Sequence, residues 1–301
     1  QIAFKKIQNI IKEFKPDIVH THAAKAGALG RRAAYKMGVN QIYHTFHGHV
    51  FHSYFGNFKT RIFKEIEKNL AKKSTKIIAI SEIQKSELSK IHKICPEKKI
   101  EVIPLGFDLE RFNTDKNSKR KEFRKKWNLK ENEIAIGIIG RLVPIKNHKF
   151  FIDAIQEVLK NSKVPIRAFI VGDGEEKQNI INYIKNKNLD FSLNYNPATF
   201  HLTSWIKEID RVNSGMDIIC LTSLNEGTPV SLIEAQASGK PIVSTKTGGI
   251  ENIVLENKTA LLSEKNDLHN FSKNLLSLVN DSNKRKLFSK LGLEKSKDFH
   301  Y

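Results

Sequence analysis

The chain has 301 residues, of which 40% are hydrophobic and 28% are charged. This balance is typical of a globular protein with room for two domains, and it excludes a disordered or fibrous chain. The two cysteines, Cys95 and Cys220, are too few for a disulfide framework or a cysteine-based zinc site. No signal-peptide core and no apolar run of membrane-spanning length occurs in the sequence. We therefore expect a protein of the reducing cytoplasm.

The net charge of +19 is concentrated in the first third of the chain. Residues 1–100 contain 20 lysine and arginine residues against 7 acidic ones, whereas residues 101–301 contain 31 against 25. A basic surface attracts phosphate-bearing partners, which include nucleic acid, anionic lipid headgroups and nucleotide-linked substrates. A lysine-rich, solvated surface explains the same composition, so the charge alone leaves these interpretations open.

Short β-branched segments alternate with helical patterns along the first hundred residues, and this alternation is typical of the βαβ units of a parallel sheet. Strands are predicted at 17–20, 41–44, 75–80 and 100–103, and helices at 25–37 and 58–73. The second helix is predicted to place Phe58, Ile62, Ile66 and Leu70 on one face, with basic residues over the rest. Such a helix is either an ordinary surface helix or one that faces a membrane.

Turn residues and a short basic helix at 118–126 interrupt this pattern, and a second series of strands follows. These strands are predicted at 134–139, 167–171, 217–221 and 241–244. They are apolar on both faces, as a sheet covered by helices on each side requires. We place the boundary between two α/β domains at 107/108, which gives domains of residues 1–107 and 108–301.

Ligands of open α/β sheets bind beyond the carboxyl ends of the strands, so the residues after each strand form the candidate site. Gly140, Arg141 and Lys146 follow the strand at 134–139. The glycine permits close backbone approach, and an arginine fork with a lysine charge can hold a diphosphate and offset its charge. Glycine turns that include Gly172, and the segment 247–249, follow two other strands and permit the same approach.

Glu226 and Glu234 flank the predicted start of the helix that follows the strand at 217–221. Thr228 is predicted as the N-cap and Pro229 as the first helical residue, so that free amides face outward for a phosphate. The two carboxylates are then placed to accept hydrogen bonds from sugar hydroxyls, one on a ribose and one on a transferred sugar. A capped helix with two solvated carboxylates is the alternative interpretation.

The first third of the chain contains six of the eleven histidines, which are His20, His22, His44, His47, His49 and His52. A metal site is one interpretation of this cluster. The cysteines are remote, however, and residues 43–54 include no acidic ligand, so we expect neither a metal nor a cofactor. His47 follows the second strand and places an imidazole at the ligand edge, where it can bond a sugar hydroxyl.

Taken together, these segments resemble the family 4 retaining glycosyltransferases of GT-B fold. The resemblance is carried by IPLGFDLERF (103–112), IGRLVPIKNH (139–148), VGDGEE (171–176) and SLNEGTPVSLIEAQASGKPIVSTKTGG (223–249). The last segment is the most specific, because it combines the two glutamates at the family's spacing with the Gly-Lys-Pro and Gly-Gly that follow. Residues 15–34 and 44–55 look like members that build bacterial surface polysaccharides, including lipopolysaccharide, or lipid-linked glycans.

The resemblance implies two Rossmann-like domains whose sheets face a central cleft, with the acceptor on residues 1–107 and a nucleotide-sugar donor on 108–301. It places Arg141 and Lys146 on the donor diphosphate and Glu234 on the ribose. Glu226 and the backbone of Gly227, Thr228, Pro229 and Val230 are implied near the transferred sugar and phosphate. His47 matches the active-site histidine of the family's first domain.

The implied reaction moves a sugar, expected from a UDP-linked donor, to a lipid-linked or polysaccharide acceptor at the cytosolic face of the membrane. Configuration at the anomeric carbon is retained, and the departing diphosphate itself can take the acceptor's proton. The residues agree with this chemistry, since they supply cations and amides for a leaving group but no obvious pair of catalytic carboxylates. The basic first third is the reason to expect a peripheral contact with an anionic membrane.

The family's first domain opens with several βα units before the helix at which this chain starts, and its closing C-terminal helix is also expected to be missing. The chain is therefore expected to be a fragment with an incomplete first domain. A nucleotide-sugar epimerase of the same fold, a basic nucleic-acid-binding protein and a fragment that only binds nucleotide are the alternatives. The nucleic-acid alternative is disfavoured, because no recognised module or aromatic platform accompanies the charge.

Overall fold

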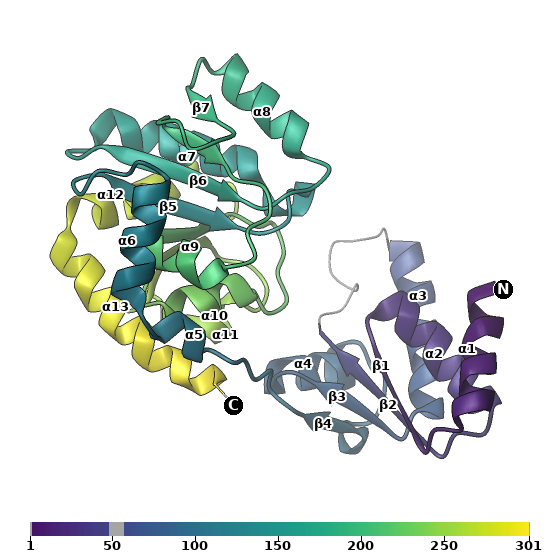
Figure 1. The fold of residues 1–301 in the computed structure, drawn as a ribbon. Helices are drawn as coiled ribbons and strands as arrows, with labels where there is room; N and C mark the ends of the chain where they lie inside the picture. Colours follow the sequence, from purple (N-terminus) through teal and green to yellow (C-terminus); the bar gives the residue numbers. More distant parts are fainter. Residues whose placement is uncertain (1, 48–56, 301) are drawn as a thin grey trace. The chain divides into compact units, whose positions relative to one another are not determined.

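The computed structural model describes residues 2–47 and 57–300 of the chain. These residues form two compact units, Gln1–Leu105 and Gly106–Tyr301, each with its own sheet. The division lies two residues before the boundary predicted from the sequence. Figure 1 shows the two units, which are described separately below.

The first unit is built on a four-stranded parallel sheet in the order β1-β2-β3-β4. Its elements are α1 (Ile2–Phe14), β1 (Ile18–His22), α2 (Ala24–Lys36), β2 (Gln41–Phe46), α3 (Asn57–Lys73), β3 (Lys76–Ala79), α4 (Glu82–Ser86), the π-helical turn η1 (Glu87–Ile91), the 3-10 turn η2 (Glu97–Lys99) and β4 (Ile100–Val102). Each strand pairs with the next one in the chain, so right-handed crossovers place the connecting helices on one face of the sheet. The four strands predicted from the sequence are confirmed.

The core of the first unit lies between that face and its helices, around Phe46, Ile77, Leu88, Ile94 and Ile100. These side chains come from β2, β3, β4 and the segment between β3 and β4. Their burial holds the segment that follows η1 firmly against the sheet.

The face predicted for the helix at 58–73 is partly wrong. Leu70 is buried, but Ile62 and Ile66 are 45% and 43% exposed, and the side chain of Phe58 lies outside the described residues. Glu67 occupies the buried face instead, where it pairs with Arg31 of α2 at 2.7 Å. A hydropathy pattern cannot find this face, because an ion pair between two helices takes the place of an apolar contact.

The second unit is built on a seven-stranded parallel sheet in the order β11-β10-β9-β5-β6-β8-β7. Its strands are β5 (Ile134–Ile139), β6 (Ile166–Val171), β7 (Phe191–Ser192), β8 (Phe200–Leu202), β9 (Ile218–Leu221), β10 (Ile242–Thr245) and β11 (Ala260–Ser263). Its helices and 3-10 turns are α5 (Glu110–Asn113), α6 (Lys116–Lys126), η3 (Pro144–Lys146), α7 (His148–Asn161), α8 (Lys177–Asn186), α9 (Ile209–Gly215), α10 (Val230–Ala237), α11 (Ile250–Ile253), α12 (Leu268–Asn280), α13 (Ser282–Ser296) and η4 (Lys297–Phe299).

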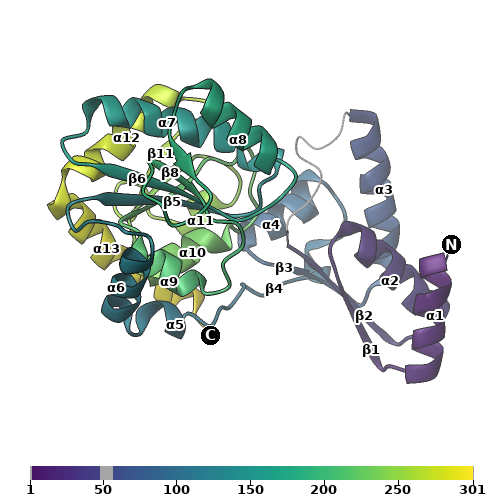
Figure 2. The ribbon, with the colours of Figure 1, turned by 45° about the horizontal axis from the view of Figure 1, so that its top comes forward.

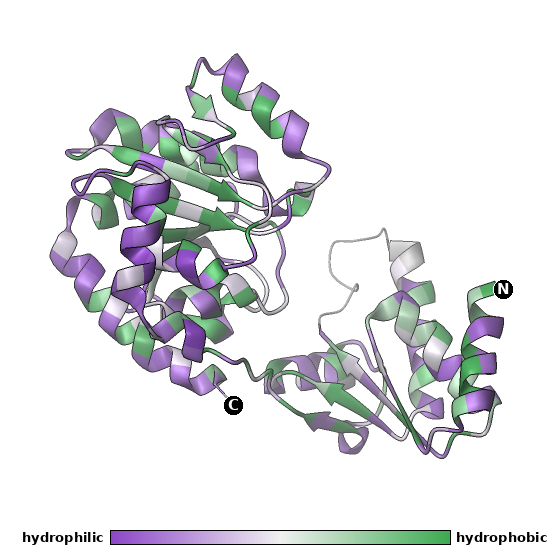
Figure 3. Cartoon of the chain, in the orientation of Figure 1, coloured by the Kyte–Doolittle hydropathy of each residue, from purple (hydrophilic) through white to green (hydrophobic). Residues whose placement is uncertain are grey.

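This sheet is doubly wound and covered on both faces, as Figure 2 shows. From β5 the chain passes through β6 to β7 at the edge of the sheet and then forms β8 between β6 and β7. It next crosses to β9 on the other side of β5 and continues outward to β11. One core packs the sheet against α7, α8 and α12, and a second packs its other face against α6, α9 and α10. The central strands β5 and β6 are therefore mostly apolar, and Figure 3 shows much of their length in green. The winding direction changes between β5 and β9, where open α/β sheets bind ligands.

Candidate active site

Lys146 and Glu226 meet at the point where the winding direction changes. Lys146 lies in the loop after β5 and Glu226 in the loop after β9, and their Nζ and Oε1 atoms are 2.5 Å apart. The side chains are 20% and 11% exposed, so the pair is reachable from solvent but mostly shielded from it. Ser223 donates a further hydrogen bond of 2.6 Å to the same carboxylate oxygen. A cation and a carboxylate are thus held at the carboxyl edge of the sheet.

Backbone contacts fix the two loops that carry this pair. The amide of Leu224 donates to the carbonyl of Ile145 at 2.8 Å. The hydroxyl of Thr222 donates to the carbonyl of Lys146, also at 2.8 Å. Because these bonds join the loops on either side of the ion pair, the pair has little freedom to separate.

A glycine contact joins the loop after β5 to the loop after β6. Gly172 has φ +144°, and a Cβ at this position would overlap the carbonyl oxygen of Gly140. The amide of Gly140 donates to the carbonyl of Val171 at 2.9 Å. Only glycine tolerates both the backbone angle and the close approach at position 172. The sequence predicted that Gly140 and Gly172 let the backbone approach a ligand closely. In the structure, the close approach at these glycines is between the two loops themselves.

A second glycine contact supports the loop that carries Glu226. A Cβ at Gly248, which has φ +54°, would overlap the carbonyl oxygen of Glu226, and one at Gly249 would overlap that of Gly227. The hydroxyl of Thr247 donates to the carbonyl of Leu224 at 3.0 Å. The segment 247–249 therefore acts as a platform for the loop after β9.

The start of the helix after this loop differs from the prediction by one residue. The helix α10 begins at Val230, and Pro229, rather than Thr228, occupies the N-cap position, without a side-chain capping bond. Proline has no amide hydrogen to lose there, so the free amides belong to the residues after it. Gly227 and Val230 are exposed, and Pro229 is buried against the unit.

Arg141 is the predicted cation without an internal partner. Its side chain is exposed, and no carboxylate in residues 2–47 or 57–300 lies within ion-pair distance of it. Lys146, in contrast, is paired with Glu226. An unpaired guanidinium on the loop after β5 is available to an anionic ligand.

Glu234 lies one turn into α10, in surroundings different from those of Glu226. Burial raises the pKa of the Glu234 carboxyl to about 7, while nearby Arg111 lowers it and Asp210 raises it further. Arg111 belongs to α5 and Asp210 to α9. The structure therefore brings Lys146 and Glu226 together, but it places Glu234 beside α5 and α9.

In the first unit, His47 lies just after β2 and contacts His22 at the end of β1. The distance from His22 Nδ1 to His47 Nε2 is 2.8 Å, and the ring centroids are 5.0 Å apart. Burial, and then the charge of His22, lower the pKa of His47. One imidazole must donate and the other accept, so this contact selects the tautomer of each ring.

The other histidines have different surroundings. His44 is buried beneath α2, bonded to the Thr21 hydroxyl at 2.9 Å, and burial lowers its pKa to about 3. His49 and His52 lie outside the described residues. In the part of the chain that the structure describes, no group of three histidine, cysteine or acidic side chains is arranged to hold a metal ion.

Sequence reasoning missed Thr222, Ser223 and Trp205. The two hydroxyl residues directly follow β9, and that position was the available signal. Trp205 follows β8 and is 63% exposed. Its neighbour Ser204 accepts a hydrogen bond of 3.1 Å from the Gly172 amide, which ties this loop to the same edge. A hydropathy pattern does not show that this tryptophan is exposed near the carboxyl edge of the sheet, so it could not single out Trp205.

Two family models match the chain. The model described as "Glycosyl transferases group 1" matches residues 119–295, and that described as "Glycosyltransferase Family 4" matches residues 2–111. The chain is 34% identical over 278 residues to an Escherichia coli UDP-Gal:alpha-D-GlcNAc-diphosphoundecaprenol alpha-1,3-galactosyltransferase, covering 91% of this chain and 69% of the relative. It is 26% identical over 275 residues to the capsular polysaccharide biosynthesis glycosyltransferase CapM of Staphylococcus aureus, covering 90% and 69%.

Solved structures share the fold at lower identity. The Anabaena protein Alr3699/HepE, in complex with UDP and glucose, matches with a TM-score of 0.82 at 19% identity, over 98% of this chain and 77% of that one. Staphylococcus aureus TarM matches with a TM-score of 0.76 at 19% identity, over 98% and 55%. The α/β fold with two parallel sheets is thus the GT-B fold. Together with the family models, these matches show that the chain belongs to the group 1 glycosyltransferases, with a family 4 region at residues 2–111.

Proposed function

We propose that this glycosyltransferase moves a sugar from a UDP-sugar to a lipid-linked or polysaccharide acceptor, with retention of configuration at the anomeric carbon. The observation that carries the proposal is the Lys146–Glu226 pair at the winding change of the second sheet. The E. coli relative is named for a UDP-sugar donor, and the Anabaena structure contains UDP. These names support the choice of the donor.

In this proposal the donor diphosphate lies between Lys146 and Arg141. When the diphosphate approaches, the Lys146 ammonium is shared between it and Glu226, so the site is prepared for negative charge. Arg141 offers a fork of donors to phosphate oxygens. The backbone amides of Gly227 and Val230, both exposed residues on either side of Pro229, donate to the same group. Together they stabilise the charge that develops as the sugar–phosphate bond breaks.

The two glutamates bind hydroxyls in this proposal. Glu226, fixed by Lys146 and Ser223, accepts a hydrogen bond from the transferred sugar. Glu234 accepts one from the ribose. No general base is required, because an oxygen of the departing diphosphate takes the acceptor's proton. The cations supply the stabilisation that a metal would otherwise give, so the proposal includes neither a metal nor a cofactor.

The acceptor side is assigned to the first unit. His47 is proposed to bond a hydroxyl of the reacting sugars, with His22 fixing its tautomer. The acceptor named for the E. coli relative is a diphosphoundecaprenol-linked sugar, and CapM is named for capsular polysaccharide. A lipid-linked glycan acceptor in surface polysaccharide synthesis is therefore proposed for this chain.

We also propose that the enzyme works at the cytoplasmic face of the membrane as a peripheral protein. In the described part of the chain, no helix is both long and apolar enough to cross a bilayer. The excess of basic residues in the first hundred positions supplies an attraction to anionic lipids.

Calorimetry with UDP tests the donor site. The double variant Arg141→Ala and Lys146→Ala should weaken UDP binding by about 100-fold, since two charged contacts to the diphosphate are lost. Lys163→Ala removes an exposed lysine near the start of β6 and serves as the control, which should bind as the wild type does. Equal affinity in the double variant and the control would reject the site.

A transfer assay tests the reaction itself. With UDP-sugars and a polyprenyl-diphosphate sugar, the product should carry the sugar in the donor's anomeric configuration, as read by NMR coupling constants. Activity should survive EDTA, because the proposal includes no metal. Release of UDP and an altered free sugar without acceptor would identify an epimerase instead.

A further inference from the structure

A cavity of about 390 Å³ lies in the first unit, away from the histidines at the carboxyl edge of its sheet. Its lining residues come from α3, from η1 and from the segment after η1; they are Glu65, Lys68, Asn69, Lys72, Ser89, Lys93, Ile94, Cys95 and Pro96. The helix α3 ends at Lys73, just before β3 begins, and Pro96 comes shortly before β4 begins. The cavity therefore lies toward the amino ends of β3 and β4, opposite the edge that carries His47.

The cavity is positively charged. Its lining has three lysines and one glutamate, and only Lys68 is neutralised, by Glu65 at 2.6 Å. In residues 2–47 and 57–300, no carboxylate lies within ion-pair distance of Lys72 or Lys93. Lys99 adds a fourth ammonium nearby, since its Nζ donates to the carbonyl of Lys72 at 3.4 Å. The lining therefore carries two ammonium groups beyond its internal pair.

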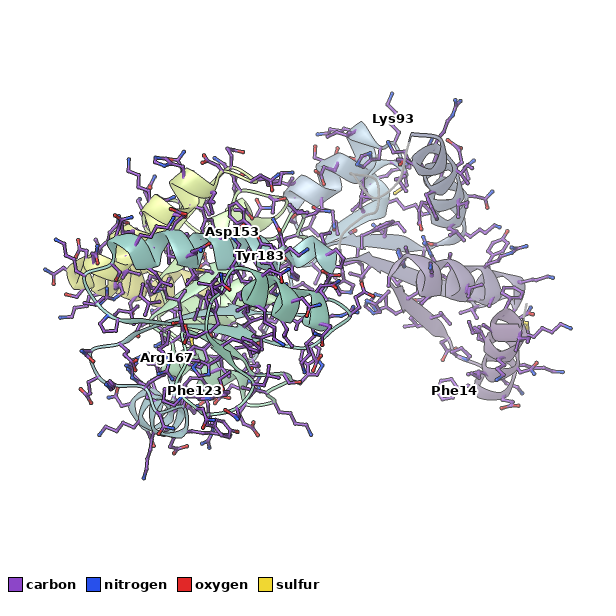
Figure 4. All side chains as sticks on the ribbon, turned by 90° about the horizontal axis from the view of Figure 1, so that it is seen from above. Phe14, Lys93, Phe123, Asp153, Arg167 and Tyr183 are labelled. Atoms are coloured by element: carbon purple, nitrogen blue, oxygen red, sulfur yellow. The ribbon has the colours of Figure 1, made fainter. Side chains whose placement is uncertain are left out.

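The wall of the cavity is firmly built. Ile94 is only 4% exposed, belongs to the core of the first unit, and its amide donates to the carbonyl of Leu88 at 2.8 Å. Lys93, which precedes it, has φ +52° and an exposed side chain. Figure 4 labels Lys93 at the surface of the first unit. The core contact of Ile94 thus fixes the backbone from which the Lys93 ammonium extends.

We propose that this cavity is a second anion site, which takes a phosphate monoester carried on a small polar molecule. A phosphate monoester has a charge of about −1.5 to −2 at pH 7, which matches the two unpaired lysines. Lysine binds phosphate as a point charge, and the cations of the lining are all lysines. The volume exceeds that of a phosphate group alone and is within the range of roughly 300–1,000 Å³ for small-molecule sites.

The phosphate monoester can be soluble or can be the headgroup of a lipid, and one experiment separates the two. Binding of glycerol 3-phosphate is measured by calorimetry, and binding of phosphatidate-containing vesicles by co-sedimentation against phosphatidylcholine vesicles. Each is compared between the wild type, the pocket pair Lys72→Gln and Lys93→Gln, and the control pair Lys12→Gln and Lys36→Gln. The control lysines are exposed on α1 and α2, and their substitution removes the same amount of charge as the pocket pair does.

The wild type should bind at least one of the two probes, and the probe that binds identifies the source of the phosphate. The pocket pair should weaken this binding by at least about tenfold, and the control pair by less than about twofold. Equal weakening in both pairs would overturn the proposal, as would no binding of either probe by the wild type. UDP binding should be unchanged in the pocket pair, so the result is independent of the proposed donor site.

Cys95 provides a second readout within the cavity. It is half-buried, whereas Cys220 is only 1% exposed, so a thiol reagent should react first at Cys95. Burial raises the pKa of the Cys95 thiol, and the reaction is therefore followed at alkaline pH. The bound probe should slow alkylation of the wild type by about tenfold and leave the rate of the pocket pair unchanged. An unprotected Cys95 in the wild type with the probe bound would overturn the proposed location.

Discussion

The two units present their ligand edges by different means. In the second unit, glycine contacts and backbone hydrogen bonds tie together the loops after β5, β6, β9 and β10. In the first unit, the described edge is formed by imidazoles, with His22 against His47 and His20 against Thr45. The second sheet is covered by helices on both faces, and the connecting helices of the first lie on one. The edge of the second unit depends on backbone contacts, so a methyl group added to one of its glycines should disrupt it. The edge of the first unit depends on side chains, so the replacement of one imidazole should disrupt it.

The largest expected effect comes from breaking a glycine contact in the second unit. Gly172→Ala places a methyl group against the Gly140 carbonyl at a backbone angle that alanine disfavours. The free energy of unfolding of the second unit should fall by on the order of 4 kcal/mol. Urea unfolding followed by tryptophan fluorescence reports this unit alone, because both tryptophans, Trp127 and Trp205, belong to it.

The matched control is Gly292→Ala, a glycine inside α13. A Cβ there meets Gln236 at 3.7 Å, which is ordinary contact, so stability should be unchanged or rise by about 0.5–1 kcal/mol. If both substitutions gave the same unfolding midpoint, the loops would not depend on their glycine contact.

The next effect concerns the ion pair in the second unit. Glu226→Gln keeps the shape of the side chain but removes the charge that faces Lys146. Transfer should slow by about 100-fold in kcat, because the sugar contact and the orientation of the lysine are both lost. UDP affinity should change by less than about tenfold, since Lys146 keeps its charge. Glu175→Gln, an exposed neighbour of the loop after β6, should retain full activity. A variant at 226 with wild-type kcat would remove Glu226 from the reaction.

Much of this fold could be predicted from the sequence. The strands β5 and β9 are continuous apolar segments, and the structure confirms them close to the predicted bounds. The strands β7, β8 and β11 were not predicted, and β7 and β8 contain only two and three residues. β8 even contains a buried histidine, His201, which is stacked on Phe169 and accepts from Arg167 at 3.1 Å. A polar side chain buried by such partners has no hydropathy signal.

The candidate site could be predicted as separate residues but not as contacts. The rule that ligands bind at strand ends led to Lys146 and Glu226 independently, although they are 80 positions apart in sequence. Their contact depends on the strand order β9-β5, which spacing along the chain does not specify. The same limit explains why the approach of Gly172 to Gly140 became visible only in three dimensions.

A smaller effect is expected at the side-chain edge of the first unit. His47→Asn should lower kcat by roughly 10- to 100-fold, because a donor to the reacting sugars is lost, while UDP affinity stays unchanged. His22→Asn should lower kcat less, and the double variant should lose less than the product of the two factors because the rings act together. His269→Asn, on the exposed surface of α12, is the control. Loss of UDP affinity in His47→Asn would contradict the division of roles between the units.

The smallest effect is a pH dependence at Glu234. Its pKa of about 7 lies above the ordinary glutamate value of 4.5, so the folded protein binds more protons than the unfolded chain between these two pH values. Stability should therefore fall as pH rises from about 4.5 through 7, by on the order of 1–2 kcal/mol. Glu234→Gln should remove this slope and be more stable than the wild type at pH 8, and thermal melting at pH 5 and pH 8 measures both. Ribose binding by the ionised carboxylate would make UDP affinity rise over the same interval in the wild type alone. Parallel melting curves for the two proteins at both pH values would show that Glu234 is as solvated as an ordinary surface glutamate.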